Sequence, residues 1–128
     1  MSNIPYSVEQ IIDFCKNNEI LIVERKDRKN QKFRESCGKT EEEAEEEIRK
    51  LEKKYCKKDK ILDKDKPDNY LYEFHKEVWG KWCYIKLSII DERVIVNVIS
   101  FHESEGTEYE WNEETRKICW LLPRVWLL

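Results

Sequence analysis

The sequence predicts one α+β domain spanning residues 1–128, in which N-terminal helices pack on a small antiparallel β-meander. The length of 128 residues fits a single domain, and three Gly and three Pro leave little material for flexible linkers. Helical periodicity is confined to the first half of the chain, whereas β-branched and aromatic residues alternate over 70–103. We therefore expect a charged helical part (1–66), a meander (70–103) and a C-terminal extension (104–128).

Capping boxes predict where two helices begin. The pairs Ser7/Gln10 and Thr40/Glu43 place helices over about residues 8–17 and 41–54. The second of these would place Ala44, Ile48, Leu51 and Tyr55 on one face. A short helix over 31–37 would end at Gly38, because glycine tolerates the left-handed conformation after a helix.

The remaining pattern favours strands. Residues 20–23 form a short β-branched run, and 70–75, 81–90 and 93–101 are the expected strands of the meander. The charged segment between the second capped helix and residue 70 is expected to be a connection. Strand 81–90 should bury one face and present a polar one, since Cys83, Ile85, Leu87 and Ile89 alternate with Tyr84, Lys86 and Ser88.

The composition excludes several classes of protein. Charged residues make up 40% of the chain, but five Trp, six Tyr and four Phe argue against disorder. Five cysteines without a CxxC pair indicate neither a zinc ribbon nor a disulfide framework, and no apolar run approaches 20 residues. Two separate histidines and the lack of a glycine-rich loop predict no metal and no cofactor. We expect a cytoplasmic protein with reduced thiols and no membrane contact.

The charge is divided along the chain. The net charge is −3, yet residues 25–34 carry six basic residues against one acidic, and 53–66 carry seven against three. Segments 41–47 and 103–114 each contain six Glu and no basic residue. The net charge therefore does not exclude a basic face that binds RNA. The residues expected to contact such a substrate are Arg25, Lys26, Arg28, Lys58 and Arg93.

The apolar segment 118–128 has two interpretations. Its eleven residues are too few to span a bilayer. It either packs on the core of this domain or forms a contact with a partner or with a second copy in a homodimer.

Tyr84 and Lys86 lie two residues apart and therefore share one strand face. Together with His102 and Glu73 they would suit metal-free RNA cleavage, which needs a base, a cation and an acid. The alternative is a set of solvated polar residues on an exposed sheet face. The hairpin decides part of this question: a two-residue loop sets Tyr84 opposite Ile99 with His102 on the other face, whereas a three-residue loop puts both on one face.

Segments 82–87 (WCYIKL) and 98–103 (VISFHE) resemble the closing hairpin of the MqsR-type toxins of type II toxin–antitoxin systems. Segment 70–76 (YLYEFHK) resembles the preceding strand of that family, and the helix over 41–54, ending at Leu51 and Tyr55, resembles its helical step. This resemblance covers about residues 8–103 and is specific only over 70–103. It implies a RelE-like fold and an endoribonuclease restrained by an antitoxin protein.

The resemblance assigns roles residue by residue. The catalytic Tyr of the family matches Tyr84, His102 stands where the best-known members have a lysine, and Glu73 replaces an amide. An upstream catalytic lysine has no clean match, and Lys57 is favoured among residues 55–58. The resulting hypothesis puts Tyr84 on the scissile phosphate, Lys86 or Lys57 as the cation, and His102 as general acid or base. A second hypothesis is a non-catalytic interaction module that uses the sheet face or the apolar C-terminal segment.

Overall fold

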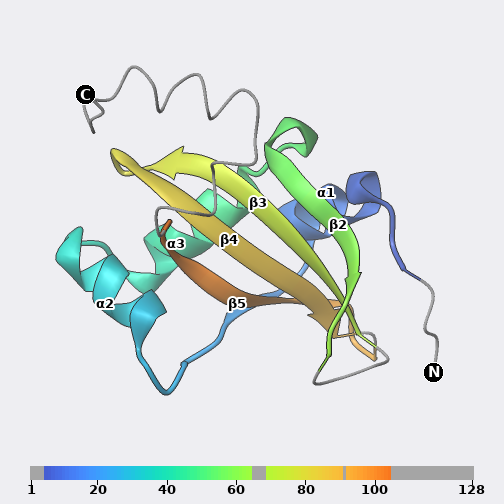
Figure 1. Cartoon of the computed structure of the whole chain (residues 1–128), viewed down its shortest axis with the longest axis horizontal. Helices are drawn as coiled ribbons and strands as arrows, with labels where there is room; N and C mark the ends of the chain where they lie inside the picture. The colour runs from blue at the N-terminus through green and yellow to red at the C-terminus, as the bar shows by residue number, and fades with distance from the viewer. Residues whose placement is uncertain (1–4, 65–68, 91, 105–128) are drawn as a thin grey trace.

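A five-stranded mixed sheet forms the centre of the molecule. The computed structural model describes residues 5–64, 69–90 and 92–104, and within these the strand order is β1-β5-β4-β3-β2 (Figure 1). The strands are β1 (Ile20–Ile22), β2 (Cys56–Leu62), β3 (Tyr70–Val78), β4 (Lys81–Ile90) and β5 (Ile95–Glu103). Strands β3 to β5 form the predicted antiparallel meander, β2 adds an antiparallel edge strand to it, and β1 pairs with β5 in parallel. The α+β class is confirmed, but the expectation of a purely antiparallel sheet was wrong.

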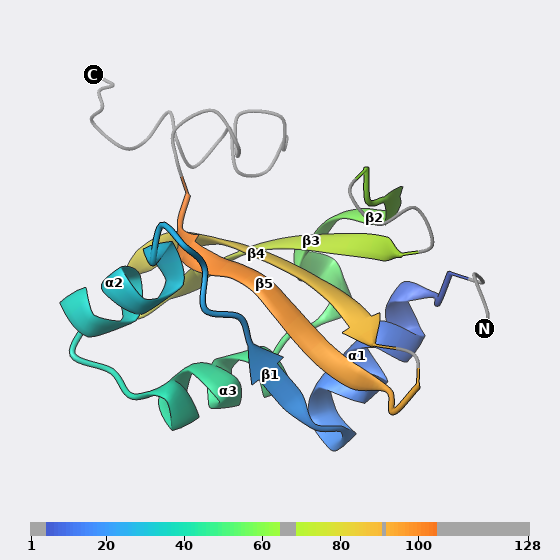
Figure 2. The same cartoon turned by 90° about the horizontal axis from the view of Figure 1, so that it is seen from below.

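The helices cover one face of this sheet. Helices α1 (Val8–Asn17) and α3 (Glu41–Arg49) lie on the same side of it, and α2 (Lys29–Ser36) packs beside β5 (Figure 2). Both predicted capping boxes are present, at Ser7 and Thr40. Gly38 follows α2 with a φ of 68°, and the Gly38 and Lys39 amides donate to the carbonyls of Glu35 and Arg34. This pair of bonds is the Schellman motif that ends many helices.

The second capped helix is shorter than the sequence indicated. It ends at Arg49 rather than near residue 54, and a 3-10 turn (Lys53–Tyr55) follows. Leu51 is nevertheless fully buried, although it lies outside the helix. The apolar spacing thus predicted burial correctly, whereas the charged residues after Arg49 were wrongly included in the helix.

Strand β2 was missed by the sequence analysis, which treated its residues as a connection. Its sequence, CKKDKIL, does not alternate between apolar and polar residues. It lies at one edge of the sheet, its register with β3 shifts twice, and Lys60 has a φ of 55°. An irregular, charged edge strand does not show the period of two on which strand prediction depends.

The core lies between the helices and the sheet. Its fully buried members include Ile11 of α1, Ile48 of α3 and Phe74 of β3. Arg49 joins α3 to α1, because its guanidinium donates to the carbonyls of Cys15, Lys16 and Asn18 at 3.0, 3.3 and 3.0 Å. No helix among the described residues is long and apolar enough to cross a membrane.

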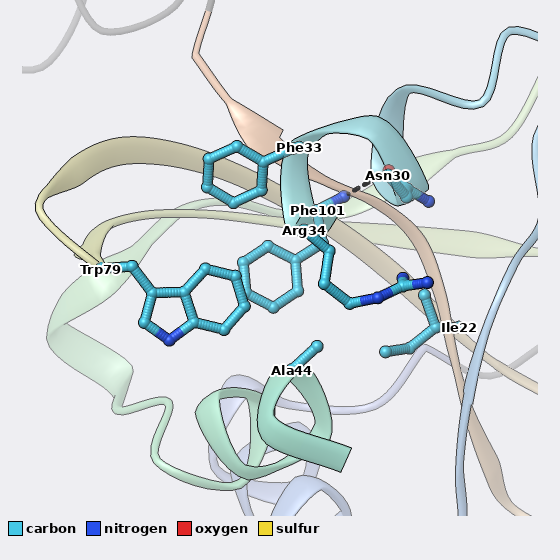
Figure 3. A pocket seen from close by; sticks show the side chains of 7 residues that line it. All are labelled: Ile22, Asn30, Phe33, Arg34, Ala44, Trp79 and Phe101. Atoms are coloured by element: carbon cyan, nitrogen blue, oxygen red, sulfur yellow. Dashed lines mark hydrogen bonds between the residues drawn. The ribbon is translucent and has the colours of Figure 1, made fainter. Parts of the chain in front are cut away.

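An aromatic stack closes one end of the sheet. Trp79 and Gly80 connect β3 to β4 with φ values of 55° and 79°, as a two-residue hairpin of type I′ requires. The Trp79 ring stacks on Phe33 and Phe101, with ring centroids 5.7 and 5.6 Å apart. These rings line a small pocket with Ala44 and Arg34 (Figure 3). The stack stabilises a backbone conformation that a bulky residue rarely adopts.

Candidate functional site

Three rings form a row across the sheet on the face opposite α1 and α3. Tyr84 of β4 pairs with His75 of β3 on one side and with His102 of β5 on the other. Ring centroids lie 5.5 Å apart for His75 and Tyr84, and 5.8 Å apart for Tyr84 and His102. Tyr84 and His102 therefore share one face. We name this surface, made by Glu73, His75, Tyr84, Lys86, Ser100 and His102, the polar face.

A second row of polar residues lies next to the rings. Lys86 pairs with Glu73 of β3 and Ser100 of β5, and Glu73 pairs in turn with Lys58 of β2. The two rows are linked, because the Tyr84 hydroxyl donates a hydrogen bond of 2.9 Å to the Glu73 carboxylate. The structure thus brings together the four principal residues predicted from the sequence.

Arg25 reaches the same face from the connection between β1 and α2. Its Nη1 donates to Ser100 Oγ at 2.8 Å, and its Nη2 forms a 2.9 Å ion pair with Asp27. The Arg25 side chain is 28% exposed and lies beyond Ser100 in the row that contains Lys86. With Lys58 at the other end, this row holds three cations against two carboxylates, those of Glu73 and of Asp27, the ion-pair partner of Arg25. The arrangement can attract and orient an anion such as a phosphodiester.

The two histidines of the polar face differ in chemistry. The Nδ1 atom of His102 lies 3.0 Å from the Glu103 carbonyl oxygen. A carbonyl oxygen only accepts, so this contact requires a proton on Nδ1 and leaves Nε2 able to accept a proton in the neutral ring. His75 is 3% exposed, and its burial, followed by the nearby charges of Lys57 and Lys58, lowers its pKa to about 4. His75 is therefore neutral near pH 7.

The other predicted substrate-binding residues are distributed unevenly. Lys57, half-buried in β2, lies close enough to His75 for its charge to lower that pKa. Lys26 and Arg28 are exposed in the connection before α2, and Arg28 donates to Gln31. Arg93 lies in the β4–β5 connection, at the opposite end of these strands from Tyr84, and pairs with Glu19. The structure does not bring Arg93 to the polar face.

Sequence reasoning passed over His75 and Ser100 as site members. Their positions carry a usable signal, since His75 is two residues from Glu73 and Ser100 is two residues from His102. Residues two apart in a strand share a face, so each is expected beside its predicted neighbour.

The described part of the chain contains no metal site, and three of its thiols are protonated near pH 7. Burial raises the pKa of Cys15 and Cys83 to about 12 and that of Cys56 to about 11, so these thiols are protonated near pH 7. Within residues 5–64, 69–90 and 92–104, no group of three His, Cys, Asp or Glu side chains is placed to hold a metal ion.

Comparisons with known proteins found no match among protein-family models and no significantly similar curated protein. The assignment of function therefore depends on the geometry of the polar face and on the resemblance in sequence.

Proposed function

We propose that the protein is a toxin-like, metal-independent endoribonuclease with a RelE/MqsR-like fold, which cleaves single-stranded RNA and is neutralised by an antitoxin protein. The observation that carries this proposal is the gathering of Tyr84, His102, Lys86 and Glu73 on one sheet face. Among these groups are a candidate base, a hydroxyl donor and a cation, which are the components that RNA cleavage requires.

The proposed reaction is attack of a ribose 2′-hydroxyl on the adjacent phosphorus. The P–O5′ bond breaks, and the products are a 2′,3′-cyclic phosphate and a free 5′-hydroxyl. His102 Nε2 takes the 2′ proton, because its Nδ1 is committed to the Glu103 carbonyl. Tyr84 contacts the scissile phosphate, and its hydroxyl donates the proton that the departing O5′ requires. Lys86 stabilises the charge that develops on the phosphate oxygens.

The charge of the face supports phosphate binding despite two departures from the family pattern. Glu73 in place of an amide and His102 in place of a lysine both reduce the positive charge. Lys58 and Arg25, the latter paired with Asp27, lie in the same cross-strand row as Lys86 and restore part of it. We expect the phosphate to bind on the Arg25 side of Lys86, away from the Glu73 carboxylate.

The test is cleavage of single-stranded RNA by the purified protein in the presence of a metal chelator. Tyr84→Phe and His102→Ala should each reduce the rate about 100-fold or more, which is the usual contribution of a positioned proton-transfer group. Arg93→Ala is the matched control and should change the rate less than about twofold, since Arg93 lies at the other end of the strands. Intact RNA with the wild-type protein, together with normal growth on its induced expression, would refute the proposal.

A second candidate is a non-catalytic interaction module of the same fold. It is favoured by the engagement of the Tyr84 hydroxyl with Glu73 and by the low exposure of His102, at 7%. The apolar segment 118–128, its other expected contact surface, lies outside the described residues. Trp126→Ser combined with Leu127→Ser should then change the assembly state in size-exclusion chromatography, while Tyr84→Phe leaves every phenotype unchanged.

A further inference from the structure

One extra residue in β5 determines which side chains lie beside Tyr84. From Ile95 to Val98, β5 pairs with β4 in a regular ladder that includes Leu87 opposite Val98. The next pair is Lys86 opposite Ser100, so Ile99 is an additional residue, a β-bulge. Had the ladder continued without it, Tyr84 would lie opposite Phe101.

The consequence for the site follows from alternation along a strand. In the regular register, Ser100 and His102 would point to the helix face, and Phe101 would lie on the polar face. With the bulge, Phe101 is 3% exposed and in contact with Phe33, while His102 pairs with Tyr84. The bulge therefore assembles the polar face.

Asn30 of α2 bonds to the backbone on both sides of Ser100. Its Nδ2 donates to the Ile99 carbonyl at 3.0 Å, and its Oδ1 accepts from the Phe101 amide at 2.9 Å. The same Nδ2 donates to the Val23 carbonyl at 3.1 Å, just after the end of β1. Asn30 thus takes the place of a longer β1 at the edge of β5, and it is only 3% exposed.

The position of Asn30 is itself fixed by local structure. The Asp27 carboxylate accepts from the Lys29 amide at 3.0 Å at the beginning of α2. Arg28 adopts the left-handed conformation with a φ of 58° and so turns the chain into the helix. Asn30 is the second residue of α2, so this short turn delivers its amide to the bulge.

We propose that Asn30 is a positioning residue, which holds the Ile99 bulge and thereby places His102 and Ser100 beside Tyr84 and Lys86. A side chain that both donates and accepts is required, because the bulge presents a carbonyl and an amide to it. Alanine supplies neither group. Aspartate retains the acceptor for Phe101 but sets a carboxylate against two carbonyl oxygens. The effect of Asn30 on the pairing of β5 with β4 does not depend on the proposed function. Its effect on RNA cleavage rests on that proposed function.

The experiment measures pairing and activity in the same variants. NMR contacts between the Tyr84 and His102 rings report the register, and cleavage of single-stranded RNA reports the site. Asn30→Ala and Asn30→Asp should lose the ring contact and reduce cleavage at least tenfold. The neighbouring Gln31→Ala, which removes two surface hydrogen bonds, one from Arg28 and one to Glu35, is the matched control and should change neither.

Deletion of Ile99 supplies the rescue. It converts β5 into a regular strand in which Tyr84 still lies opposite His102, so pairing should no longer depend on Asn30. The double variant, the Ile99 deletion with Asn30→Ala, should therefore keep the ring contact even if Asn30→Ala alone fails to fold. Retention of the ring contact in folded Asn30→Ala, or its loss in the double variant, would overturn the inference. If wild-type protein leaves RNA intact, the proposed function fails while the ring contact still tests Asn30.

Discussion

The two faces of the central sheet are built on different principles. On the helix face, made by Cys83, Ile85, Leu87 and Ile89 of β4, every side chain is apolar and at most 5% exposed. On the polar face, Tyr84 and Lys86 are half-buried, and His75, Ser100 and His102 are buried. The two faces are therefore opposite in chemistry, and the polar face is also the more exposed of the two.

This difference shows what each face requires from the fold. Removing apolar side chains from water stabilises the folded state in any arrangement that fills space. The helix face therefore needs only apolar side chains of the right total volume that are buried. Buried polar groups depend on particular partners, so the polar face needs the correct register. A substitution on the helix face should accordingly reduce the stability of the fold. A substitution on the polar face should instead disturb the geometry of the candidate site.

The largest expected effect comes from truncating the helix face. Leu87→Ala should reduce the free energy of unfolding by about 3–4 kcal/mol, because Leu87 is fully buried and its removal leaves a cavity. Lys86→Ala, at the adjacent position but on the polar face, is the matched control, and its expected loss is below about 1 kcal/mol. Urea denaturation measures both, and similar losses for the two variants would contradict the division between faces.

Acid should weaken the protein through His75. The folded-state pKa of about 4 lies below the ordinary value of 6.5, so the neutral ring is favoured by folding. The neutral His75 ring therefore contributes to the free energy of unfolding, in full above pH 6.5. This stabilisation, about 3 kcal/mol, is lost as the pH falls from 6.5 towards 4.

His75→Phe separates this effect from general acid unfolding. Phenylalanine keeps a ring at this position but does not titrate, so unfolding curves of the variant should lose the step between pH 6.5 and 4. The substitution should cost little at pH 7, because His75 Nδ1 is buried without a hydrogen-bond partner among the described residues. An NMR titration in which His75 protonates near pH 6.5 would refute the assignment.

A smaller effect is expected at the polar link within the helix layer. Arg49→Ala removes three bonds to carbonyls at the end of α1 and should cost about 2 kcal/mol, as is typical for hydrogen bonds from a charged group. Arg49→Lys should recover part of this loss, since a lysine carries the charge but not the planar fork. Thermal unfolding measures both variants, and unchanged stability in Arg49→Ala would show that this link contributes nothing.

The smallest expected stability effect concerns the Tyr84–Glu73 bond of the polar face. Tyr84→Phe removes one hydrogen bond at 2.9 Å and should cost about 1 kcal/mol. The same variant is expected to lose RNA cleavage about 100-fold, so activity and stability respond on very different scales. A loss of stability as large as that of Leu87→Ala would instead make Tyr84 a core residue.

Local signals predicted much of the fold. The capping boxes at Ser7 and Thr40 gave the starts of α1 and α3, Gly38 gave the end of α2, and the alternation in 81–90 gave β4 with its two faces. Strand β2 and the end of α3 were mispredicted, because consecutive charged residues carry no hydrophobic period. The parallel pairing of β1 was missed for another reason: three residues cannot specify their partner.

The candidate site shows most clearly which features follow from the sequence and which follow from the tertiary structure. The sequence by itself determined that Tyr84 and Lys86 share a face, because side chains alternate along every strand. It left two registers open for His102, and the structure shows neither: the connection has four residues, 91–94, and a bulge follows at Ile99. Only the tertiary structure decided that Tyr84 lies opposite His102. The bulge that sets this pairing is held by Asn30 of α2, which lies 69 and 71 residues before its bonding partners Ile99 and Phe101 in the sequence.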